Sequence, residues 1–448
     1  MKNRISILLI NPWITDFAAY NFWAEPLGLL YIASILREAG AHINYINCLC
    51  SSYNKNPKPK DTGCSKYIRR IINKPECLSF VRRNYAIYGI KEDEFINNLY
   101  KIDHPDIVLV TSFMTYWYPG ICKLIKLVRE GLGRRVPVIL GGIYSKLCSS
   151  HAKIHSNADF IYTEDDLVYL LKLIERTSGK QFKSYPQVNR FSDFPLPSHE
   201  LHRGVNFFSI LTRRGCPYSC NYCASGILSP TFSSRTKDSI ISEISKYTKT
   251  LKTKNVAFYD DALLVDSDHH IIPVLEEIIK KCPGLSFHLP NGIHGGLITK
   301  RIAKTFFSAG IHTIRIGFET ADEELQKKTG KKTTNSEYIQ AVNFLREAGY
   351  QRKNIGTYIM AGLPGQTAHD VEASIDFVFQ AGGSPYLSYF SPIPGTKIWR
   401  EAVRCTPFPI EQEPLFQNNT IFILGNKNFS ENTIQYLKNK AVELRKPH

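Results

Sequence analysis

The sequence predicts an α/β protein with two parts, a doubly wound parallel domain followed by a partial (β/α)6 barrel. Three observations predict this fold class. Short apolar runs alternate with longer segments of helical periodicity along most of the 448 residues, as expected where helices cover both faces of a parallel sheet. A Pro- and Ser-rich stretch without either periodicity interrupts the alternation at 178–204. Beyond it, a strand–helix unit recurs six times.

The first domain is predicted at 1–177. Its strands are the runs ISILLI, HINYINC, DIVLVTS, PVILGG and ADFIYT. The helix PLGLLYIASILREAG has Pro26 in its first turn and stops at Gly40. Two further helices are YPGICKLIKLVREGLG and DDLVYLLKLIERT. This alternation predicts a flavodoxin- or Rossmann-like sheet.

A basic insertion is predicted at 51–103, between the second and third strands. Positions 51–90 hold nine Lys or Arg and two acidic residues, a balance of +7 within a net charge of +16 for the whole chain. The composition is that of a loop. We interpret this concentrated charge as a docking or substrate-recruiting surface, or as a solvated loop, and not as evidence for nucleic acid.

The barrel is predicted at 205–400 and is TIM-like, but with six units. Its strands are FFSILTRRG, NVAFYDD, LSFHLPN, TIRIGFE, IGTYIMAG and YLSYFSPI. Helices are predicted between them, at 237–249, 272–281, 299–308, 336–348 and 368–380. A C-terminal extension at 401–448 ends in an amphipathic helix for which Ser430 is the candidate N-cap.

Composition excludes several classes of protein. With 43% hydrophobic and 21% charged residues, the chain can build a large core and is not disordered. An odd number of cysteines, 11, argues against a secreted disulfide scaffold. No apolar run is long enough for a membrane span. The basic and apolar start of the chain resembles a signal peptide but lacks a cleavage site, so we expect a cytoplasmic protein.

The strongest motif is RRGCPYSCNYC, which places Cys216, Cys220 and Cys223 in a CxxxCxxC array. Three thiolates this close converge only if the chain loops around a metal centre. They fit a cubane iron–sulfur cluster with one open iron, whereas a structural zinc site normally needs a fourth protein ligand. The other eight cysteines form no such array, and we expect them to be ordinary core or surface thiols.

With Tyr222 just before its last cysteine, the array resembles that of the radical S-adenosylmethionine (radical SAM) superfamily, over about 205–400. The resemblance implies that Cys216, Cys220 and Cys223 are the catalytic metal ligands of a [4Fe-4S] cluster. SAM would chelate the open iron and be cleaved to a 5′-deoxyadenosyl radical. A low-potential donor such as flavodoxin or ferredoxin would supply the electron.

Further residues stand where this family would place cofactor contacts. Asp260 and Asp261 follow the second barrel strand, Glu319 ends the fourth, and Gly362 and Gly365 follow the fifth. The resemblance implies that they, with Tyr222, bind SAM. Each also has a structural interpretation, as a helix cap, an ion pair or a turn. The family's usual GGEP motif is absent, so the residues that bind the SAM amine are not identified.

An α/β domain ahead of such a barrel resembles the cobalamin-binding domain of the cobalamin-dependent branch. PVILGG fits the glycine turn that passes along the corrin, and Ser112, Gly141 and Gly142 are the candidate contacts, with Thr111 and Glu164 as further ones. The DxHxxG motif that supplies a lower histidine ligand is absent. The lower face would therefore carry water, nothing, or a residue that the motif search does not find.

The resemblance implies a cobalamin-dependent radical SAM enzyme, most simply one that methylates an unactivated carbon of a small-molecule or peptide substrate. Two alternatives stay open: a cobalamin-dependent rearrangement or cyclisation, and RNA modification of the methylthiotransferase kind. The latter lacks its second cysteine trio here, and nucleic acid is an unlikely partner. A merely structural cluster would not need an open iron. Candidates for the substrate pocket are His288, Asn291, His294, Tyr389 and Phe390.

Overall fold

The computed structural model describes residues 4–50, 62–330, 332–424 and 429–446. The chain divides into two compact units. Unit 1 comprises Met1–Phe208 together with Gln412–Thr420, and unit 2 comprises Ser209–Glu411 together with Ile421–His448. The C-terminal extension is thus shared between the units, since the chain returns to unit 1 before its last helix.

Unit 1 is built on a five-stranded sheet with the order β3-β1-β6-β7-β8, in which every paired neighbour is parallel. The strands are β1 Ser6–Asn11, β3 His42–Asn47, β6 Ile107–Val110, β7 Val138–Leu140 and β8 Phe160–Ile161. This is the flavodoxin-like order and confirms the predicted doubly wound sheet. The order reverses between β1 and β6, and ligands of such sheets bind outside the carboxyl ends of the strands at that point.

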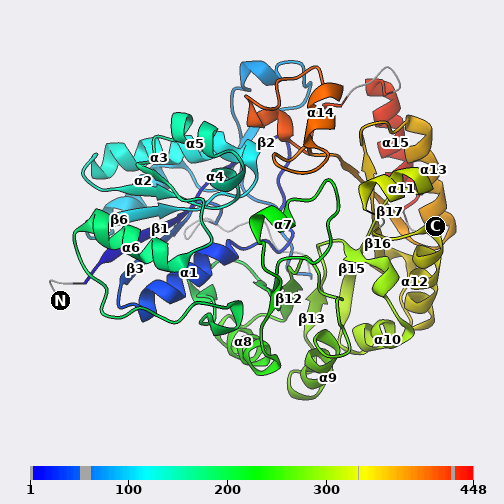
Figure 1. Ribbon diagram of the computed structural model, residues 1–448, viewed down its shortest axis with the longest axis horizontal. Helices are drawn as coiled ribbons and strands as arrows, with labels where there is room; N and C mark the ends of the chain where they lie inside the picture. The colour runs from blue at the N-terminus through cyan, green and yellow to red at the C-terminus, as the bar shows by residue number, and fades with distance from the viewer. Residues whose placement is uncertain (1–3, 51–61, 331, 425–428, 447–448) are drawn as a thin grey trace. The chain divides into compact units, whose positions relative to one another are not determined.

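Helices cover both faces of this sheet (Figure 1). Successive strand residues alternate between two cores, with Ile7 and Leu9 in one and Leu8 and Ile10 in the other. The first core packs under α1 Leu27–Glu38 and α6 Leu167–Ser178. The second packs under α2 Glu92–Tyr100, α3 Tyr118–Leu132, α4 Ile143–Leu147 and α5 Ser149–His155. Two buried faces explain why the central strands β6 and β7, and Ile7 to Ile10 of β1, are apolar without interruption.

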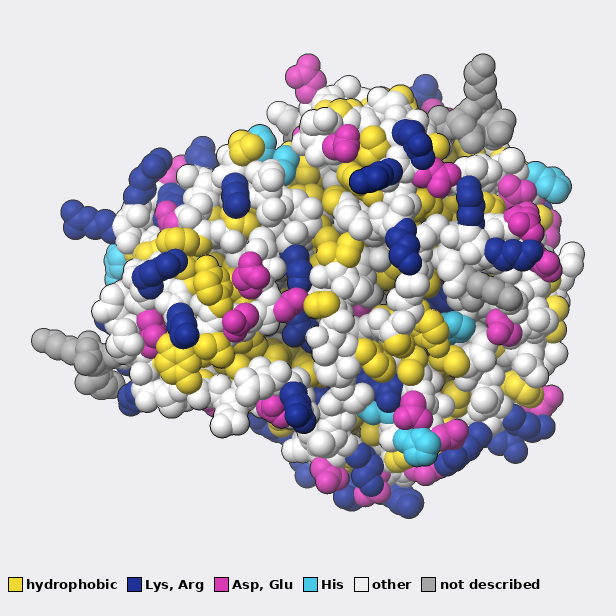
Figure 2. Space-filling view, viewed as in Figure 1, with side chains coloured by type: hydrophobic (Ala, Val, Ile, Leu, Met, Phe, Trp, Pro, Cys, Tyr) yellow, Lys and Arg dark blue, Asp and Glu magenta, His cyan; other side chains and the backbone are white. Residues whose placement is uncertain are grey.

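Two strands of the basic insertion form a small antiparallel sheet with a strand that follows β1, and the sequence interpretation missed this sheet. Its order is β2-β5-β4, with β2 Ile14–Asp16, β5 Ala86–Tyr88 and β4 Arg69–Ile71. Each strand has only three residues, and β2 pairs with residues far along the chain, so no local periodicity indicates it. Positions 51–61 of the insertion lie outside the described residues. On the face that Figure 2 shows, Lys and Arg side chains are dispersed among Asp and Glu.

Unit 2 is the partial barrel, and its strands lie in space in the order of the chain, β9-β12-β13-β15-β16-β17. They are β9 Phe208–Ile210, β12 Asn255–Phe258, β13 Ser286–His288, β15 Ile311–Glu319, β16 Ile355–Ala361 and β17 Ser384–Tyr389, while β14 Ile293–His294 pairs with β15. Neighbouring strands from β12 to β17 pair in parallel. The six predicted strands are all present.

Five helices lie between the barrel strands as predicted: α8 Lys237–Thr250, α9 Ile271–Lys281, α10 Lys300–Ser308, α12 Asn335–Glu347 and α13 Ala368–Gln380. The short helix α11 Glu323–Thr329, between β15 and α12, was not predicted. Short α7 Ser225–Leu228 follows the cysteine array, α14 Trp399–Cys405 follows β17, and α15 Glu431–Glu443 ends the fold. The Ser430 side chain accepts from the backbone N–H of Thr433, which confirms its predicted N-cap role. Within the described residues, every helix is too short or too polar to cross a bilayer.

The two faces of β15 have different partners. Phe318 packs against the helices, with its ring centroid 4.6 Å from that of Tyr338 in α12. On β16, the Thr357 hydroxyl lies 2.7 Å from the Tyr338 hydroxyl, so Thr357 also faces the helices. Since strand side chains alternate, Arg315 and Glu319 project from the opposite, inner face of the barrel.

Candidate active site

The cysteine array lies on the connection between β10 Arg213–Arg214 and β11 Ser233–Ser234, which pair in antiparallel fashion just after β9. This is the carboxyl end of the first barrel strand, where sites of (β/α) barrels are built. Cys216 and Cys220 are half-buried, Cys223 is exposed, and all three thiols are free. The β10–β11 pair therefore presents the loop at the end of the barrel expected for chemistry.

The environment of the thiols matters because metal ligands must be deprotonated. Burial raises the pKa of Cys216 and Cys220, and the neighbouring thiols of the array raise it further. Among the residues described, no three His, Cys, Asp or Glu side chains converge on one point as ligands of a single metal ion would. In a cubane cluster each cysteine binds a different iron, so the three thiols need not converge on one point to hold a cluster.

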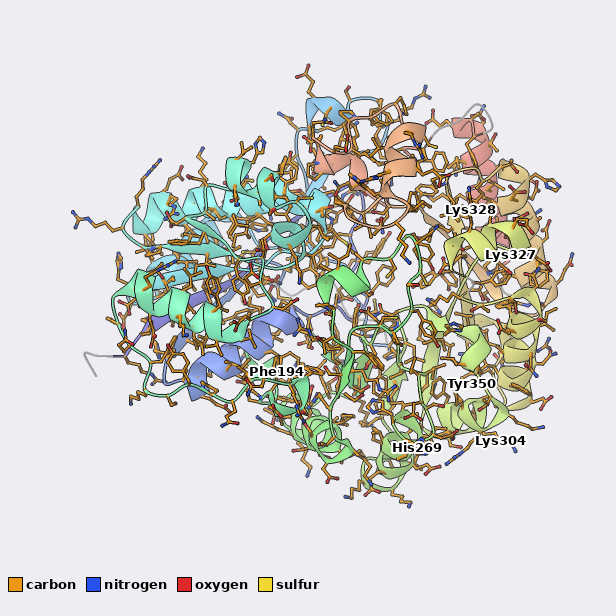
Figure 3. The ribbon with its side chains drawn as sticks, in the orientation of Figure 1. Phe194, His269, Lys304, Lys327, Lys328 and Tyr350 are labelled. Carbon is orange, nitrogen blue, oxygen red and sulfur yellow. The ribbon has the colours of Figure 1, made fainter. Side chains whose placement is uncertain are left out.

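Residues at the end of α11 form hydrogen bonds with the cysteine loop. The Asn221 side chain donates to the Lys328 carbonyl at 2.7 Å, and its backbone N–H donates to the Thr329 carbonyl at 3.2 Å. Lys328 lies on α11 beside Lys327, as Figure 3 labels. At Gly330, whose φ is +111°, a Cβ atom would lie 2.9 Å from the Cα of Cys220. Only glycine therefore lets the chain pass so close behind the second cysteine.

Glu319 and Tyr222 meet at the end of β15. The Tyr222 hydroxyl donates to Oε1 of Glu319 at 3.1 Å. Glu319 is buried and has a φ of +70°, which is unusual for a residue with a side chain. Burial raises the pKa of this carboxyl group, while the charge of Lys332 and the Tyr222 hydrogen bond act in the opposite direction. Two predicted cofactor residues, from different elements, are thus brought together.

Lys332 is the residue that sequence reasoning missed. Its ammonium group donates to the Gly292 carbonyl at 2.8 Å. Its positive charge opposes the burial that raises the pKa of Cys220, Glu319 and Asp261. It is therefore the cation shared by the cysteine loop and the carboxylates. It stands in a loop after α11, where neither periodicity nor a motif singles it out.

Asp260 lies at the end of β12 and braces the start of the cysteine loop. Its Oδ1 accepts from the backbone N–H of Thr212 at 3.0 Å, from the Thr212 hydroxyl at 2.6 Å and from the backbone N–H of Arg213 at 2.6 Å. Burial raises its pKa to about 6. One oxygen thus serves the fold, and the other, Oδ2, is buried without a hydrogen-bond partner among the described residues.

Asp261 and His294 flank the same loop. Asp261 is exposed and hydrogen-bonds to Ser225, two residues after the last cysteine. The His294 ring lies 4.8 Å from that of Tyr218, inside the array. Burial lowers the pKa of His294 to about 4, so its ring is neutral at pH 7, and its buried Nδ1 has no partner among the described residues. His294 is therefore a candidate for contact with a bound molecule.

The other pocket candidates differ in availability. His288 is fully buried and its ring nitrogens lie 3.1 Å from the Thr313 hydroxyl and 3.1 Å from Oδ1 of Asn255, which makes it a core histidine. Asn291 donates to the Tyr259 carbonyl at 2.8 Å and so ties β12 to the loop after β13. Tyr389 packs against Phe422 with ring centroids 5.6 Å apart.

The two glycines after β16 have different surroundings. A Cβ atom at Gly362 would lie 2.7 Å from the Phe422 ring, so that glycine makes room for the tail of the chain. At Gly365 the nearest atom would be the Lys328 ammonium nitrogen, 4.0 Å away. The buried Gln366 side chain organises the turn by accepting from the Gly362 N–H at 2.8 Å. Gly365, rather than Gly362, leaves space for a ligand.

In unit 1 the three candidate corrin contacts form one turn at the carboxyl ends of β6 and β7. The Ser112 hydroxyl donates to the Gly141 carbonyl at 2.7 Å and accepts from the Tyr144 N–H at 3.1 Å. Gly142 has a φ of +95°, and a Cβ atom there would overlap the Ser112 backbone. At Gly141 a Cβ atom would meet only the Tyr162 ring, at 3.7 Å. Ser112 and Gly142 shape the turn, and Gly141 is its open position.

Comparison with known proteins agrees with this architecture. Residues 210–378 match the model of the radical SAM superfamily. An uncharacterized methyltransferase of Pyrococcus horikoshii is 25% identical over 72% of this chain and 76% of its own length. The cytidylyl-2-hydroxyethylphosphonate methyltransferase of Streptomyces wedmorensis is 21% identical over 89% of this chain and 82% of its own length.

Among solved structures, the radical SAM methyltransferase TsrM of Kitasatospora setae, with cobalamin and a [4Fe-4S] cluster bound, has a similar fold. The TM-score is 0.67, at 16% identity over 99% of this chain and 91% of that one. At this identity the likeness is one of fold. It extends over both units, and thus over the combination of a flavodoxin-like unit and a partial barrel.

Proposed function

We propose that this chain, a radical SAM enzyme, is a cobalamin-dependent methyltransferase that acts on an unactivated carbon of a small molecule. One observation carries the proposal: three free thiols lie on a single loop at the carboxyl end of a six-stranded barrel, beside Lys332 and the Glu319–Tyr222 pair. The superfamily match over 210–378 and the likeness to a fold that binds cobalamin and a cluster support it.

In this proposal, residues 205–400 hold the [4Fe-4S] cluster and SAM, and residues 1–177 hold cobalamin. When bound, the cluster and SAM supply an organic radical that abstracts hydrogen from the substrate, and cobalamin supplies the methyl group. The two relatives that match 72% and 89% of this chain are named as methyltransferases, which favours methylation over the rearrangement, cyclisation and RNA-modifying alternatives.

The barrel residues would bind and orient these groups. Cys216, Cys220 and Cys223 would each lose the thiol proton to solvent and bind an iron through sulfur, and Lys332 would ease this step at Cys220 because its charge stabilises the thiolate. Glu319 would accept hydrogen bonds from ribose hydroxyls as a carboxylate. These ligand roles suit the donor atoms present, since thiols and a carboxylate oxygen face the same region.

The remaining candidate contacts would each offer a different group to a ligand. Asp260 would use its unpaired Oδ2, Asp261 its exposed carboxylate, and Gly365 its open backbone. In unit 1, Gly141 would allow the corrin to approach the backbone, while Ser112 and Gly142 keep the turn in place. We assign no lower ligand.

We further propose a flavodoxin or ferredoxin as the electron donor and the cytoplasm as the location. All 11 cysteines are free thiols, as is usual where glutathione and thioredoxin keep thiols reduced. A reducing compartment also supplies the low-potential electrons that the cluster needs.

The test is anaerobic reconstitution of the full chain with iron, sulfide and a corrinoid. We expect the absorbance of a [4Fe-4S] cluster, one bound corrinoid, and release of 5′-deoxyadenosine from SAM under reduction. The triple variant of Cys216, Cys220 and Cys223 to Ala should lose the cluster and the cleavage. Cys77→Ala, an exposed cysteine of unit 1, is the matched control and should retain both. A protein that holds a cluster but no corrinoid would disprove the cobalamin part alone.

A further inference from the structure

We propose that Arg315 and Arg445 form an oxyanion-binding subsite on the inner face of the barrel, which holds a carboxylate or phosphate group of the substrate. The inference rests on the proposed function and deepens it, because it names the chemical class of the substrate as an organic anion. No motif pointed to either residue. The placement of both side chains around Tyr386 carries the inference.

The two guanidinium groups share one aromatic ring. The Cζ of Arg315, on β15, lies 4.3 Å from the ring centroid of Tyr386, on β17. The Cζ of Arg445, just past the end of α15, lies 4.2 Å from the same centroid. Cation–π contacts of this length hold a guanidinium in place without using up its N–H donors. Most of those donors therefore stay available for a bound anion.

Among the described residues, the pair has no counter-charge. Within the described parts of the chain, neither arginine lies within ion-pair distance of a carboxylate. Arg315 donates to the carbonyl of its own neighbour, Ile314, at 2.9 Å and hydrogen-bonds to Tyr358, and Arg445 hydrogen-bonds to Tyr386. Burial and the charge of Arg315 both lower the pKa of Arg445. Two partly buried like charges around one ring repel each other, and a bound oxyanion would relieve that repulsion.

The position suits a substrate. Arg315 projects from the same inner face of β15 as Glu319, four residues before it, which corresponds to about 13 Å along the strand. On the next strand, a Cβ atom at Gly356 would lie 2.5 Å from a guanidinium nitrogen of Arg315, so this glycine makes room for the side chain. Tyr358 lies in the electrostatic field of both Arg315 and Glu319. An anionic group at the arginines would leave the far end of a medium-sized molecule near Glu319.

A purely structural role accounts for less. Arg445 could serve to attach α15 to the barrel, but α15 already has its own attachment. Lys440 pairs with Glu372 at 2.8 Å and with Asp376 at 2.7 Å, both on α13. Arg315 lies on β15, inside the barrel, and takes no part in these ion pairs. The helix is therefore held without either guanidinium.

The experiment titrates the reconstituted holoenzyme with inorganic phosphate and, separately, with acetate, by calorimetry. We expect one equivalent of at least one anion to bind. Arg315→Gln and Arg445→Gln should each weaken binding at least tenfold, and Arg315→Lys should weaken it less, because the charge remains but the planar fork is lost. Arg301→Gln, which removes surface ion pairs with Asp268 and Glu276, is the control and should bind as the unchanged protein does.

Binding of phosphate but not acetate would assign a phosphate-bearing substrate, and the reverse a carboxylate. The proposal is overturned if the unchanged holoenzyme binds neither anion, or if the Gln variants bind as tightly as Arg301→Gln. Iron content, corrinoid absorbance and thermal unfolding, measured on the same samples, keep this outcome separate from failure of the proposed function. They also show whether each variant is folded.

Discussion

At the scale of single residues, the buried carboxyl group of Asp260 shows how the fold supports the cysteine loop. Three donors from Thr212 and Arg213 converge on its Oδ1, and those residues lead directly into the array. Asp260 is thus a positioning residue through one oxygen, whatever its other oxygen binds. The sequence interpretation offered cofactor binding or a helix cap for it, and a brace between neighbouring strands was not among the options.

The pH dependence of the free energy of unfolding should include a contribution from the titration of Asp260. Burial raises its pKa from 3.8 to about 6, so the folded protein binds this proton more tightly than the unfolded chain does. The stabilisation is present in full below about pH 4 and is lost as the pH rises through about 6. At about 1.4 kcal/mol per pKa unit, the loss is about 3 kcal/mol. Asp260→Asn keeps the acceptor oxygen but does not titrate.

The measurement is the free energy of unfolding of both proteins in denaturant between pH 4 and pH 7. The value for the unchanged protein minus that for Asp260→Asn should fall across this range. His270, whose pKa burial lowers to about 4, acts in the opposite direction, but it is present in both proteins and cancels in the difference. Parallel curves would show that Asp260 does not titrate as proposed.

At the scale of elements, turns between strands and helices place the candidate ligands. The loop after α11 packs closely against the cysteine array at Gly330, and the turn after β7 packs closely against Ser112 at Gly142. Periodicity located the flanking helices and strands because their apolar faces recur every two or about 3.6 residues. Periodicity does not indicate which turns lie in contact. For this reason the sequence analysis did not identify Lys332, which lies in one of these loops, as a site residue.

Gly330→Ala should displace the second cysteine. A methyl group there would lie 2.9 Å from the Cα of Cys220, in addition to the cost of about 1–2 kcal/mol for a side chain at positive φ. Gly284→Ala is the matched control, because Gly284 has a φ of +80° and open space around it. We expect both variants to lose some stability, but only Gly330→Ala to retain less iron after reconstitution. Equal iron contents would contradict a close loop.

Substitutions at Gly141 and Gly142 should separate corrin binding from folding. Gly142→Ala places a methyl group into the Ser112 backbone at a φ of +95° and should destabilise unit 1 by several kcal/mol. In Gly141→Ala the added methyl group would contact only Tyr162, at 3.7 Å, so the free energy of unfolding should be the same as in the unchanged protein. If the corrin passes over this turn, Gly141→Ala lowers its affinity at least tenfold in an absorbance titration. Unchanged affinity would place the corrin elsewhere.

At the scale of the whole molecule, the C-terminal part of the chain completes unit 1. The buried carboxylate of Asp16, on β2, accepts from the Asn418 side chain at 2.9 Å, from the Thr420 hydroxyl at 2.9 Å and from the Trp117 indole at 2.8 Å. Asn418 is itself fully buried. Residues some 400 positions apart in the chain thus form one hydrogen-bonded network, and 412–420 belongs to the unit at the other end of the sequence.

Asn418→Ala should destabilise unit 1. It removes one of the donors that satisfy the buried Asp16, and leaving such a group short of partners costs about 1–3 kcal/mol. Amide hydrogens of β2 and β5 should exchange faster with solvent, while those of the barrel strands should not change. Asn439→Ala, at an exposed position on α15, is the control and should alter neither set. Uniform acceleration across both units would contradict a local role.

Local sequence patterns are enough to predict the two-part α/β architecture, the six barrel strands and the cysteine loop. These features are local: each is written in a short apolar run, a helical period or the spacing of three thiols. Tertiary structure alone decided the rest. It paired β2 with β5 and β4, returned 412–420 to unit 1, and set Lys332 beside Cys220 and two arginines around Tyr386. Such contacts join residues far apart in the chain, where the packing of buried side chains, and not any local pattern, selects the partners.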